Sequence, residues 1–346
     1  MSRPALAQLA SVAAIQVLLA ACSSAVSPAS APVAPLSPMG IVRRSSPSNY
    51  FSSYIGQHSP TGRTSIGFYA CPANGPLVYL VDGAHYAIDV FRGDLDGQGP
   101  CGQLTGGLIQ PQSLYVDLRT HDLYVADTGA HDSVVFHRGQ IVPFNTYTDP
   151  DPNGQYPGSI VVASDGTVIV SNYYAVNGPE MGSFSTWIEG PNGGTFVGNF
   201  PFNDYGQGRY MAINKESTVY YSDFEAPPSI GGYLLWFVSC PRGHCGRQRQ
   251  VAGVTFTDPF GMVFSADGDL IVEDTQPGRI ETFELPNPQP ATLRAAGYPD
   301  GLAIDLSDQH LFIADGYNLA EEYAYPGWVP IGVVLGDIPR GIAFDP

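Results

Sequence analysis

LYVADTGAHDSVVF, residues 123–136, places two short runs of alternating apolar residues on either side of an Asp-Thr-Gly turn. Successive side chains of a strand point to opposite faces, and a tight turn needs residues such as Gly and Asp. The stretch therefore predicts two antiparallel strands joined by a short turn.

The first of these two strands recurs along the chain. The copies are LVYLVD, LYVAD, VIVSN, VYYSD, LIVED and LFIAD, and each ends in Asp or, once, in Asn. Their last residues are Asp82, Asp127, Asn172, Asp223, Asp274 and Asp315. Self-similarity at a spacing of roughly 40 to 50 residues indicates a repeat protein.

Most copies have a companion strand before them and two further apolar strands after them. The companions begin at Pro or Gly, as in PQSLYVD (111–117) and YPDGLAID (298–305). Four short strands per unit, without the 3.6-residue apolar period of a helix, are typical of a propeller blade. We therefore predict an all-β fold, a six-bladed β-propeller with four antiparallel strands per blade.

A last companion strand, IPRGIAFDP, stands at the C-terminus with no partner after it. We expect it to pair with LVYLVD (77–82), because this pairing closes the ring and covers the sheet edges at the seam. SIGFYA (65–70) also has the character of a strand. It either competes for the seam or forms an outermost edge, and the sequence leaves both places open.

The stretch LYVADTGAH followed by an apolar strand resembles the NHL repeat, whose blades read P-x-G-I-A-V-D and then L-Y-V-A-D-x-G-N-H. The resemblance covers roughly residues 76 to 346 and implies a six-bladed propeller. It says little about activity, because such folds include lactonases, lyases, phosphotriesterases and binding platforms. The chain departs from the pattern at Asn172, which replaces the blade Asp, and in several turns that lack the Gly-Asn pair.

Composition and charge narrow the classes of partner. The 346 residues include 40 glycines and 31 prolines, which together with the periodic strands suit a β fold dense in turns. The net charge is -17 and Lys215 is the only lysine, so no basic patch attracts a phosphate backbone. We expect no nucleic acid partner, and we expect a monomer.

The N-terminus has the features of an export signal. Residues 1–21 contain one early positive charge and an apolar run with small residues before Cys22. LAAC resembles the lipobox of bacterial lipoproteins, which implies cleavage before Cys22 and lipidation of its sulfur; a plain signal peptide is the alternative. Residues 22–64 are a tether rich in Ser, Ala and Pro, and residues 65–346 are the propeller. We therefore expect a lipid anchor in a bacterial membrane, facing the periplasm or the exterior.

The four remaining cysteines predict two disulfide bonds, because an exported chain meets an oxidising compartment. Cys71 precedes the second strand of the first blade and Cys101 follows the third, and these connections share one face of a propeller. Cys240 and Cys245, in CPRGHC, would fasten a turn of the fourth blade. A metal site that adds His244 is the weaker alternative.

The six repeated blade-end residues are interpreted as structural. Asp and Asn accept hydrogen bonds from backbone N–H groups two residues on, which fixes a turn. A cation site or a set of general bases is the alternative. His85 and His131 follow the blade turns in places that we take as equivalent, so turn geometry accounts for them as well.

The mouth of the central channel is the second candidate site. The residues that open the inner strands there are Gln112, Gly158, Tyr210, Phe260, Asp300 and Arg340. Resemblance to gluconolactonase-like propellers implies a calcium-type ion held at this mouth by Glu, Asn and Asp. Asp300 alone keeps the expected type, and beside Arg340 it suggests an ion pair more than a metal cage. DPDPNG (149–154) and DLDG (94–97) match calcium loops only in part, so Ca²⁺ is a secondary expectation.

Aromatic residues expected in loops are the remaining signal, because ring faces supply contact area for glycans and peptides at small entropic cost. They are Tyr147, Tyr156, Tyr173, Tyr174, Trp187, Tyr205, Tyr317 and Trp328. No G-x-S-x-G nucleophile motif is present. We expect a platform for a protein or glycan ligand rather than an enzyme. The alternatives are a gluconolactonase-like hydrolase or lyase with a divalent cation near Asp300, and a structural subunit of an assembly.

Overall fold

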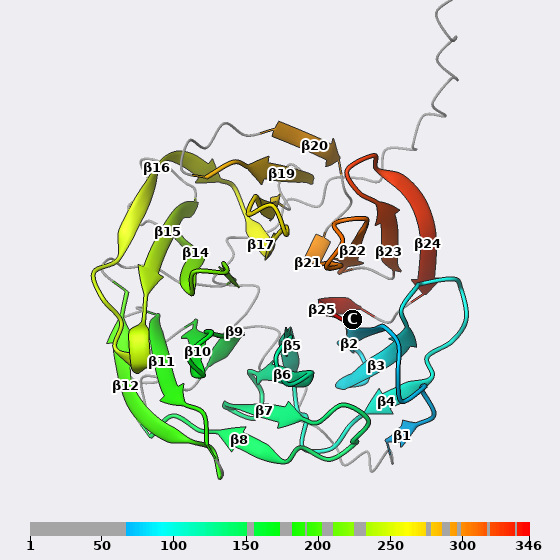
Figure 1. Cartoon of the computed structure of the whole chain (residues 1–346), viewed down its shortest axis with the longest axis horizontal. Coiled ribbons are helices and arrows are strands. Elements are labelled where there is room, and N and C mark those ends of the chain that lie inside the picture. Colours follow the sequence, from blue (N-terminus) through cyan, green and yellow to red (C-terminus); the bar gives the residue numbers. More distant parts are fainter. Residues whose placement is uncertain are drawn as a thin grey trace, which may run out of the picture. The chain divides into compact units, whose positions relative to one another are not determined.

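The fold is known from a computed structural model, which describes residues 67–150, 156–173, 182–190, 192–202, 210–224, 233–274, 278–285, 291–295, 299–316, 319–335 and 338–346. They belong to one compact unit, residues 58–346, and its strands form six sheets. In Figure 1 the sheets are arranged around a central channel as the blades of a closed ring. The predicted six-bladed propeller is therefore correct, whereas the predicted signal peptide and tether lie outside the described residues.

Five blades consist of four antiparallel strands that run in chain order from the channel outward. Blade 2 contains β5 (Pro111–Asp117), β6 (Asp122–Asp127), β7 (Asp132–Phe136) and β8 (Asn145–Tyr147). Blade 3 contains β9 (Pro157–Val162), β10 (Thr167–Asn172), β11 (Ser183–Ile188) and β12 (Thr195–Pro201). Blade 4 contains β13 (Met211–Ile213), β14 (Thr218–Phe224), β15 (Tyr233–Ser239) and β16 (Arg249–Phe256). Blade 5 contains β17 (Pro259–Phe264), β18 (Leu270–Asp274), β19 (Arg279–Phe283) and β20 (Ala291–Ala295). Blade 6 contains β21 (Pro299–Ile304), β22 (His310–Asp315), β23 (Leu319–Ala324) and β24 (Val329–Leu335).

Blade 1 closes the ring from both ends of the unit. It contains β2 (Leu77–Asp82), β3 (Ala87–Arg92) and β4 (Gly102–Leu104), and its inner strand is β25 (Pro339–Asp345). Strand β25 pairs antiparallel with β2, as expected. In this pairing Leu80, for example, lies opposite Ile342. Strand β1 (Phe68–Tyr69) pairs with β4. Within the predicted segment SIGFYA, the described strand β1 therefore forms an outermost edge and does not compete for the seam.

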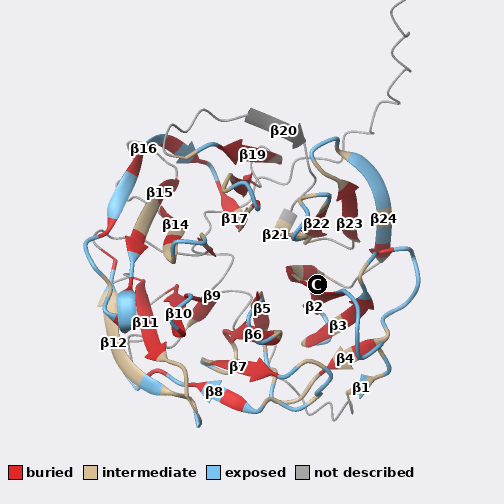
Figure 2. Cartoon of the chain, viewed as in Figure 1, coloured by how far each residue is buried: buried red, intermediate tan, exposed pale blue. Residues whose placement is uncertain are grey.

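The hydrophobic core lies between neighbouring blades rather than inside any one of them. One cluster joins Tyr79 of blade 1 to Leu114 and Val134 of blade 2, and similar clusters follow around the ring. Strands β2, β6 and β10 are buried along their whole length. Figure 2 shows these second strands as buried, while exposed residues lie on many connections and on the outer strands β16 and β24. Each blade is thus held by the burial of its two faces against its neighbours.

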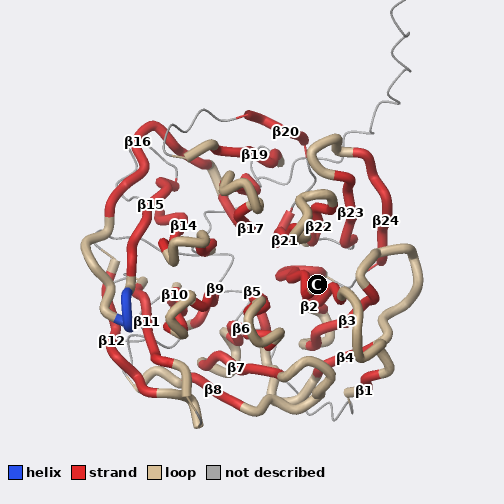
Figure 3. Tube along the Cα trace, in the orientation of Figure 1, coloured by secondary structure: helices blue, strands red, loops and turns tan. Residues whose placement is uncertain are grey.

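Two faces of the ring are named by their connections. The upper face carries the 2–3 connections within blades and the 4–1 connections between blades, so the inner strands begin there. The lower face carries the 1–2 and 3–4 connections. Pro241–Gly243, one turn of 3₁₀ helix in a 3–4 connection, is the only helical element of the described residues (Figure 3).

The 1–2 turns of alternate blades fasten each blade to the one before it on the lower face. His121, Ser217 and Asp308 have positive φ angles of 60°, 58° and 52°. The Oγ of Ser217 accepts a hydrogen bond of 3.0 Å from the Ser164 N–H. The Asp308 carboxylate accepts one of 2.9 Å from the Ala266 N–H, and His121 Nδ1 lies 2.6 Å from Asp345 Oδ1. Blades 3 and 5 have glycine at this turn position, Gly166 and Gly268, and lack the side chain that makes the link.

Disulfide bonds join Cys71 to Cys101 and Cys240 to Cys245. These are the two pairs that the positions of the cysteines in the blades predict. The first fastens β1 beside β4, and the second closes the 3–4 connection of blade 4. Two disulfides are consistent with an extracellular protein. No helix in the described part of the chain is long and apolar enough to cross a membrane.

Candidate functional site

The mouth of the channel is built from one repeated irregularity. In blades 1, 2, 3, 5 and 6 the inner strand begins at a Pro that pairs with the blade-end Asp or Asn, as Pro111 does with Asp127. The register then shifts by one residue, as at Ser113, which pairs with Ala126. The inner strand thus contains one extra residue, a β-bulge, and bulges redirect side chains. Gln112, Gly158, Phe260, Asp300 and Arg340 all lie in these bulges.

The predicted mouth residues do not all meet at one point. Gln112, Tyr210 and Asp300 line the central cavity, whereas Phe260 and Arg340 are not among its lining residues. The rings of Tyr210 and Phe260 lie 5.3 Å apart and join blades 4 and 5. Asp300 and Arg340 each lie against the 2–3 turn of their own blade, at Gly316 and Gly83.

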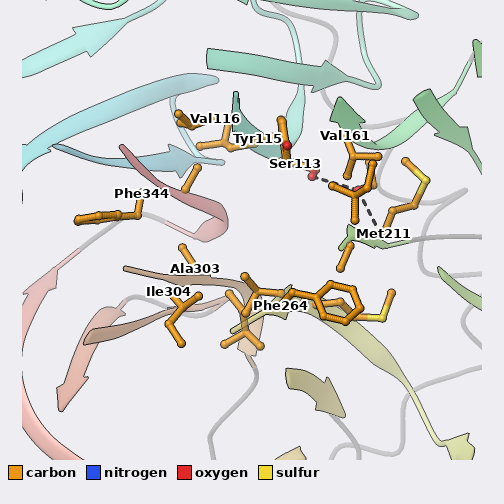
Figure 4. Close-up of a pocket in the computed structure, with 18 of the residues that line it drawn as sticks. Ser113, Tyr115, Val116, Val161, Met211, Phe264, Ala303, Ile304 and Phe344 are labelled. Carbon is orange, nitrogen blue, oxygen red and sulfur yellow. Dashed lines mark hydrogen bonds between the residues drawn. The ribbon is translucent and has the colours of Figure 1, made fainter. Parts of the chain in front are cut away.

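The central cavity has a volume of about 540 Å³ and is lined by all six inner strands. Figure 4 shows Tyr115, Val161, Met211, Phe264, Ala303 and Phe344 around its open space. Its polar side chains near the upper end include Ser113 and Ser159, whose hydroxyls lie 3.4 Å apart. The volume falls in the range of small-molecule sites, which are mostly apolar with a few polar groups.

The blade-end acids hold the connections of the upper face. Asp82 accepts hydrogen bonds of 3.1 and 3.0 Å from the N–H groups of Ala84 and His85 in the turn that follows it. Asp127 accepts two of 2.6 Å from Ile109 and Gln110, in the connection that precedes its own blade, and one of 3.2 Å from Ala130 in the turn that follows it. A carboxylate at the end of the second strand therefore fixes one or both of the connections beside it.

Asp274 repeats the arrangement of Asp127, with hydrogen bonds from Thr257 (3.1 Å) and Asp258 (2.7 Å). Asn172 differs, because its amide donates to the Ser185 hydroxyl at 2.7 Å, and that hydroxyl in turn contacts Asp149. The buried Asp149 thus takes part in a side-chain network in blade 3. It lies in the stretch that matches half of a calcium loop, of which residues 151–154 are outside the described residues. Asp223 is buried in β14, and Asp315 ends β22.

Glu273 is a buried acid that the sequence analysis did not select. It is fully buried, neither carboxylate oxygen has a hydrogen-bond partner of good geometry, and a Cβ added to Gly261 would lie 2.3 Å from it. Burial raises the pKa of Glu273 well above its ordinary value, and the charges of Asp300 and Asp315 add to this. The corresponding residues of the other blades are small or apolar, namely Val81, Ala126, Ser171, Ser222 and Ala314. An alignment of the six copies would have singled out this glutamate.

Asp132 is a second acid that the sequence analysis passed over. It pairs with Asp127 across β6 and β7, and its Oδ1 is buried without a hydrogen-bond partner. Burial, together with the Asp127 charge, raises the pKa of Asp132 to about 7. In blade 5 the corresponding residue is Arg279, which lies 3.3 Å from Asp274. A carboxyl group that titrates near neutral pH is therefore present on the upper face.

The mouth residues do not fit the divalent cation that the resemblance implies. Calcium takes six to eight oxygen ligands with several carboxylates among them. The bulge positions provide one carboxylate, Asp300, and one amide, Gln112. Across the described ranges, no three His, Cys, Asp or Glu side chains are grouped so that they could hold a metal ion.

Several of the aromatics expected in loops lie in the core instead. Tyr147 is in β8 and Trp187 is in β11, and both are buried with their rings 5.6 Å apart. Tyr173 is also buried. Trp328 lies in a 3–4 turn of the lower face against Tyr323 and Tyr325. Tyr174, Tyr205 and Tyr317 lie outside the described residues.

Tyr156 is the loop aromatic that does lie on the upper face, where its ring meets His131 edge to face at 4.8 Å. His131 and His85 are not equivalent, as the sequence analysis had assumed. His131 corresponds to Tyr86, because both have positive φ angles four residues after the blade Asp. His85 lies one position earlier, where its Nδ1 is 2.7 Å from Asp82.

Solved structures with the same fold include binding proteins and enzymes. A chain from the crystal structure of a nidogen/laminin complex matches with a TM-score of 0.58 at 13% identity, and the match covers 78% of this chain and 98% of that one. Hydrazine synthase of Kuenenia stuttgartiensis matches with a TM-score of 0.53 at 16% identity, covering 71% and 72%. An inactive virginiamycin B lyase of Staphylococcus aureus matches with a TM-score of 0.51 at 12% identity, covering 74% and 79%.

No protein-family model matches the chain, and no curated protein matches it in sequence. At these identities the neighbours show the fold alone. They are β-propellers of the NHL type and its relatives, as the repeat suggested. Propellers include both binding proteins and enzymes, so the fold alone does not assign a function.

Proposed function

We propose that this protein is an exported β-propeller, held at a bacterial membrane by a lipid on Cys22, that binds a protein or glycan ligand. The ligand would bind on the upper face over blades 3 and 4. The observation that carries the proposal is the uneven distribution of long connections on this face.

The 2–3 connections of blades 3 and 4 span residues 173–182 and 225–232. In the other blades they span 83–86, 128–131, 275–278 and 316–318. The 4–1 connections that lead into blades 3 and 4, residues 148–156 and 202–210, are long as well. Turns of three or four residues are enough to join the strands of a blade, so the extra length of these connections is not required by the fold and is available for binding.

Side chains that suit a glycan or peptide lie at the edge of this sector. Tyr156, in the connection that leads into blade 3, meets His131 of blade 2. A rigid aromatic ring beside a polar group offers contact area and a hydrogen bond together. The large negative net charge favours ligands that are neutral or basic.

The test compares two aromatic residues whose rings each contact a histidine. Tyr156→Ala on the upper face should weaken binding to a glycan array or to purified envelope proteins about tenfold, the effect of losing one aromatic anchor. Phe144→Ala is the matched control, because Phe144 stacks on His137 at 3.5 Å on the lower face. Equal losses in both variants, or none, would count against the upper-face proposal. Cys22→Ser should release the protein from the membrane fraction in either case.

A hydrolase or lyase of the gluconolactonase-like type, with Ca²⁺ near Asp300, is the second candidate. It is favoured by the Asp300 carboxylate, which lines the cavity close enough to Glu273 for its charge to act on that residue. A rise in Tm with added calcium that disappears in Asp300→Ala would support it, because a ligand that binds only the native state stabilises it. No shift, with ligand binding retained in Asp300→Ala, would support the platform.

A further inference from the structure

We propose that the central cavity is a binding site for a small, neutral, mostly apolar molecule that carries a carbonyl oxygen. This molecule enters from the lower face and points its carbonyl at Gln112. The site is separate from the upper-face platform, and its argument rests only on the fold and on the side chains that line the channel.

The entrance lies at the 1–2 turns of the lower face. The lining of the cavity continues past the ends of the inner strands to Leu118, Lys215, Gly268 and Leu306. Leu118 and Leu306 are 47% and 55% exposed, although both are large apolar residues. Two leucines in solvent at the rim of an apolar channel provide the contact surface that an apolar ligand meets first.

Two charged side chains at the same rim, Arg119 and Asp305, have partners within the protein, and Lys215 and Glu216 also lie at this rim. Arg119 lies 2.6 Å from Asp117 and 3.0 Å from Glu189. Asp305 accepts hydrogen bonds from the N–H groups of Gln309 (2.7 Å) and His310 (2.9 Å). These contacts hold the turns in place. Lys215 and Glu216 carry opposite charges, so the rim favours neither sign, and the two exposed leucines favour an apolar molecule.

The walls of the cavity are apolar over most of its depth. Val161, Met211, Ala303 and Phe344 come from four different blades and surround one open space (Figure 4). Contact with these side chains supplies affinity in proportion to the apolar area that the ligand buries. The volume of about 540 Å³ is that of a small-molecule site.

The upper end of the cavity selects the polar group of the ligand. Gln112 lines this end and is 4% exposed, and its amide nitrogen has no hydrogen-bond partner. A buried amide donor without a partner costs free energy, which a ligand acceptor would recover. The Ser113 hydroxyl, 3.4 Å from Ser159, is a second donor at this level.

A neutral acceptor fits this end better than a charged group. Asp300 lines the same end, and the chain has a net charge of -17, so a carboxylate or phosphate would be repelled. An ammonium group has no lone pair with which to accept from the Gln112 amide. A ketone, ester or amide oxygen satisfies the donor without adding charge.

The probe for this site is 6-propionyl-2-(dimethylamino)naphthalene, a neutral fluorescent ketone, titrated into the full chain. The expected result is saturable binding with blue-shifted emission. Ala303→Phe should reduce the affinity at least tenfold by filling the channel. Gln112→Met keeps the volume and removes the donor, so it should reduce the affinity about fivefold, as loss of one neutral hydrogen bond does.

Val142→Ala is the matched control, because Val142 is an exposed apolar residue outside the cavity. Val142→Ala should bind the probe with the affinity of the unsubstituted chain. Tyr156→Ala should do the same, and this result would distinguish the cavity site from the upper-face platform. If Ala303→Phe does not fold, the affinity of Gln112→Met for the probe tests the proposal by itself. Unsaturable binding, an unchanged affinity in Gln112→Met, or an equal loss in Val142→Ala would overturn the proposal.

Discussion

Blades 5, 6 and 1 meet around the channel in a different way from blades 2, 3 and 4. The third residue of the inner strand is glycine in the first group, at Gly261, Gly301 and Gly341. In the second group the corresponding residues are Ser113, Ser159 and Met211. We call the two groups the glycine half and the loop half of the ring.

In the glycine half the inner strands pack backbone against backbone. A Cβ on Gly301 would lie 2.4 Å from the Arg340 carbonyl oxygen, and a Cβ on Gly341 would lie 2.7 Å from the Gln112 carbonyl oxygen. Distances below 3.0 Å are too short for any side chain, so glycine is required. The connections that lead into these inner strands are short, at residues 257–258, 296–298 and 336–338.

In the loop half the inner strands meet through side chains. The hydroxyls of Ser113 and Ser159 face each other, and the Met211 N–H lies 3.3 Å from Ser159 Oγ. The long upper-face connections, 173–182 and 225–232, belong to this half. The difference suggests that the close backbone packing of the glycine half stabilises the ring, whereas the loop half provides the long connections available for binding. This separation is common where function is placed on loops over a rigid scaffold.

The largest expected effect on stability comes from adding one methyl group at the closest backbone contact between the inner strands of the glycine half. Gly301→Ala should cost about 4 kcal/mol of unfolding free energy or prevent folding, because backbone must move to admit the Cβ. Ser113→Ala in the loop half should cost less than about 1 kcal/mol, the value of one weak hydrogen bond. Urea unfolding measures both. Similar costs for the two variants would remove the distinction between the halves.

The two disulfides offer a second comparison, since one lies in each half. Cys71 and Cys101 are 30 residues apart in blade 1, and Cys240 and Cys245 are 5 apart in blade 4. Chain entropy predicts that replacing the first pair with alanines costs about 3–4 kcal/mol and replacing the second about 2 kcal/mol. Denaturant midpoints of the two double variants give the comparison. A larger loss from the blade 4 pair would mean that the loop half depends on its disulfide more than the ring does.

A smaller effect is expected from Asp132→Asn, at the acid pair of the loop half. The pKa of Asp132 is raised to about 7 in the folded protein, so the folded state holds its proton while the unfolded state loses it above about pH 4. The native chain therefore loses stability as the pH rises from about 4 to 7. The variant should gain a few degrees in Tm relative to the native chain over this range, and the gain should level off above pH 7.

Asp96→Asn serves as the control for the substitution itself, because Asp96 is exposed and its carboxylate accepts a hydrogen bond from Gln98. Its Tm should stay close to that of the native chain, as for other exposed surface substitutions. If the Tm difference between Asp132→Asn and the native chain did not change with pH, burial and the Asp127 charge would not raise the pKa of Asp132.

Much of the fold could be predicted because each blade ends its second strand with the same turn chemistry. The six copies and the partnerless GIAFD strand determine the blade number and the closure onto β2. The bulges could not be predicted, since a Pro-x-Gly start does not reveal where the register shifts. Tyr147 and Trp187 were misplaced because the strands that hold them are short and their apolar periods are weak.

The candidate site was predicted less completely than the fold. The residues expected at the channel mouth lie at the starts of the inner strands, but the directions of their side chains depend on the bulges, which the sequence does not show. Glu273 was visible as a break in the repeat, whereas Asp132 was not, because its pKa depends on burial against Asp127.

Replacing one long connection of the loop half by a short turn tests most directly whether the long connections bind the ligand. Residues 173–182 of blade 3 are replaced by the four-residue turn of blade 2, Thr128–His131, and both Tm and affinity for the upper-face ligand are measured. If the long connections serve binding and not the stability of the ring, the Tm of this variant stays within about 2 °C of the native chain, as for other surface changes. The variant should also lose ligand binding. A large fall in Tm, or full binding without this connection, would contradict it.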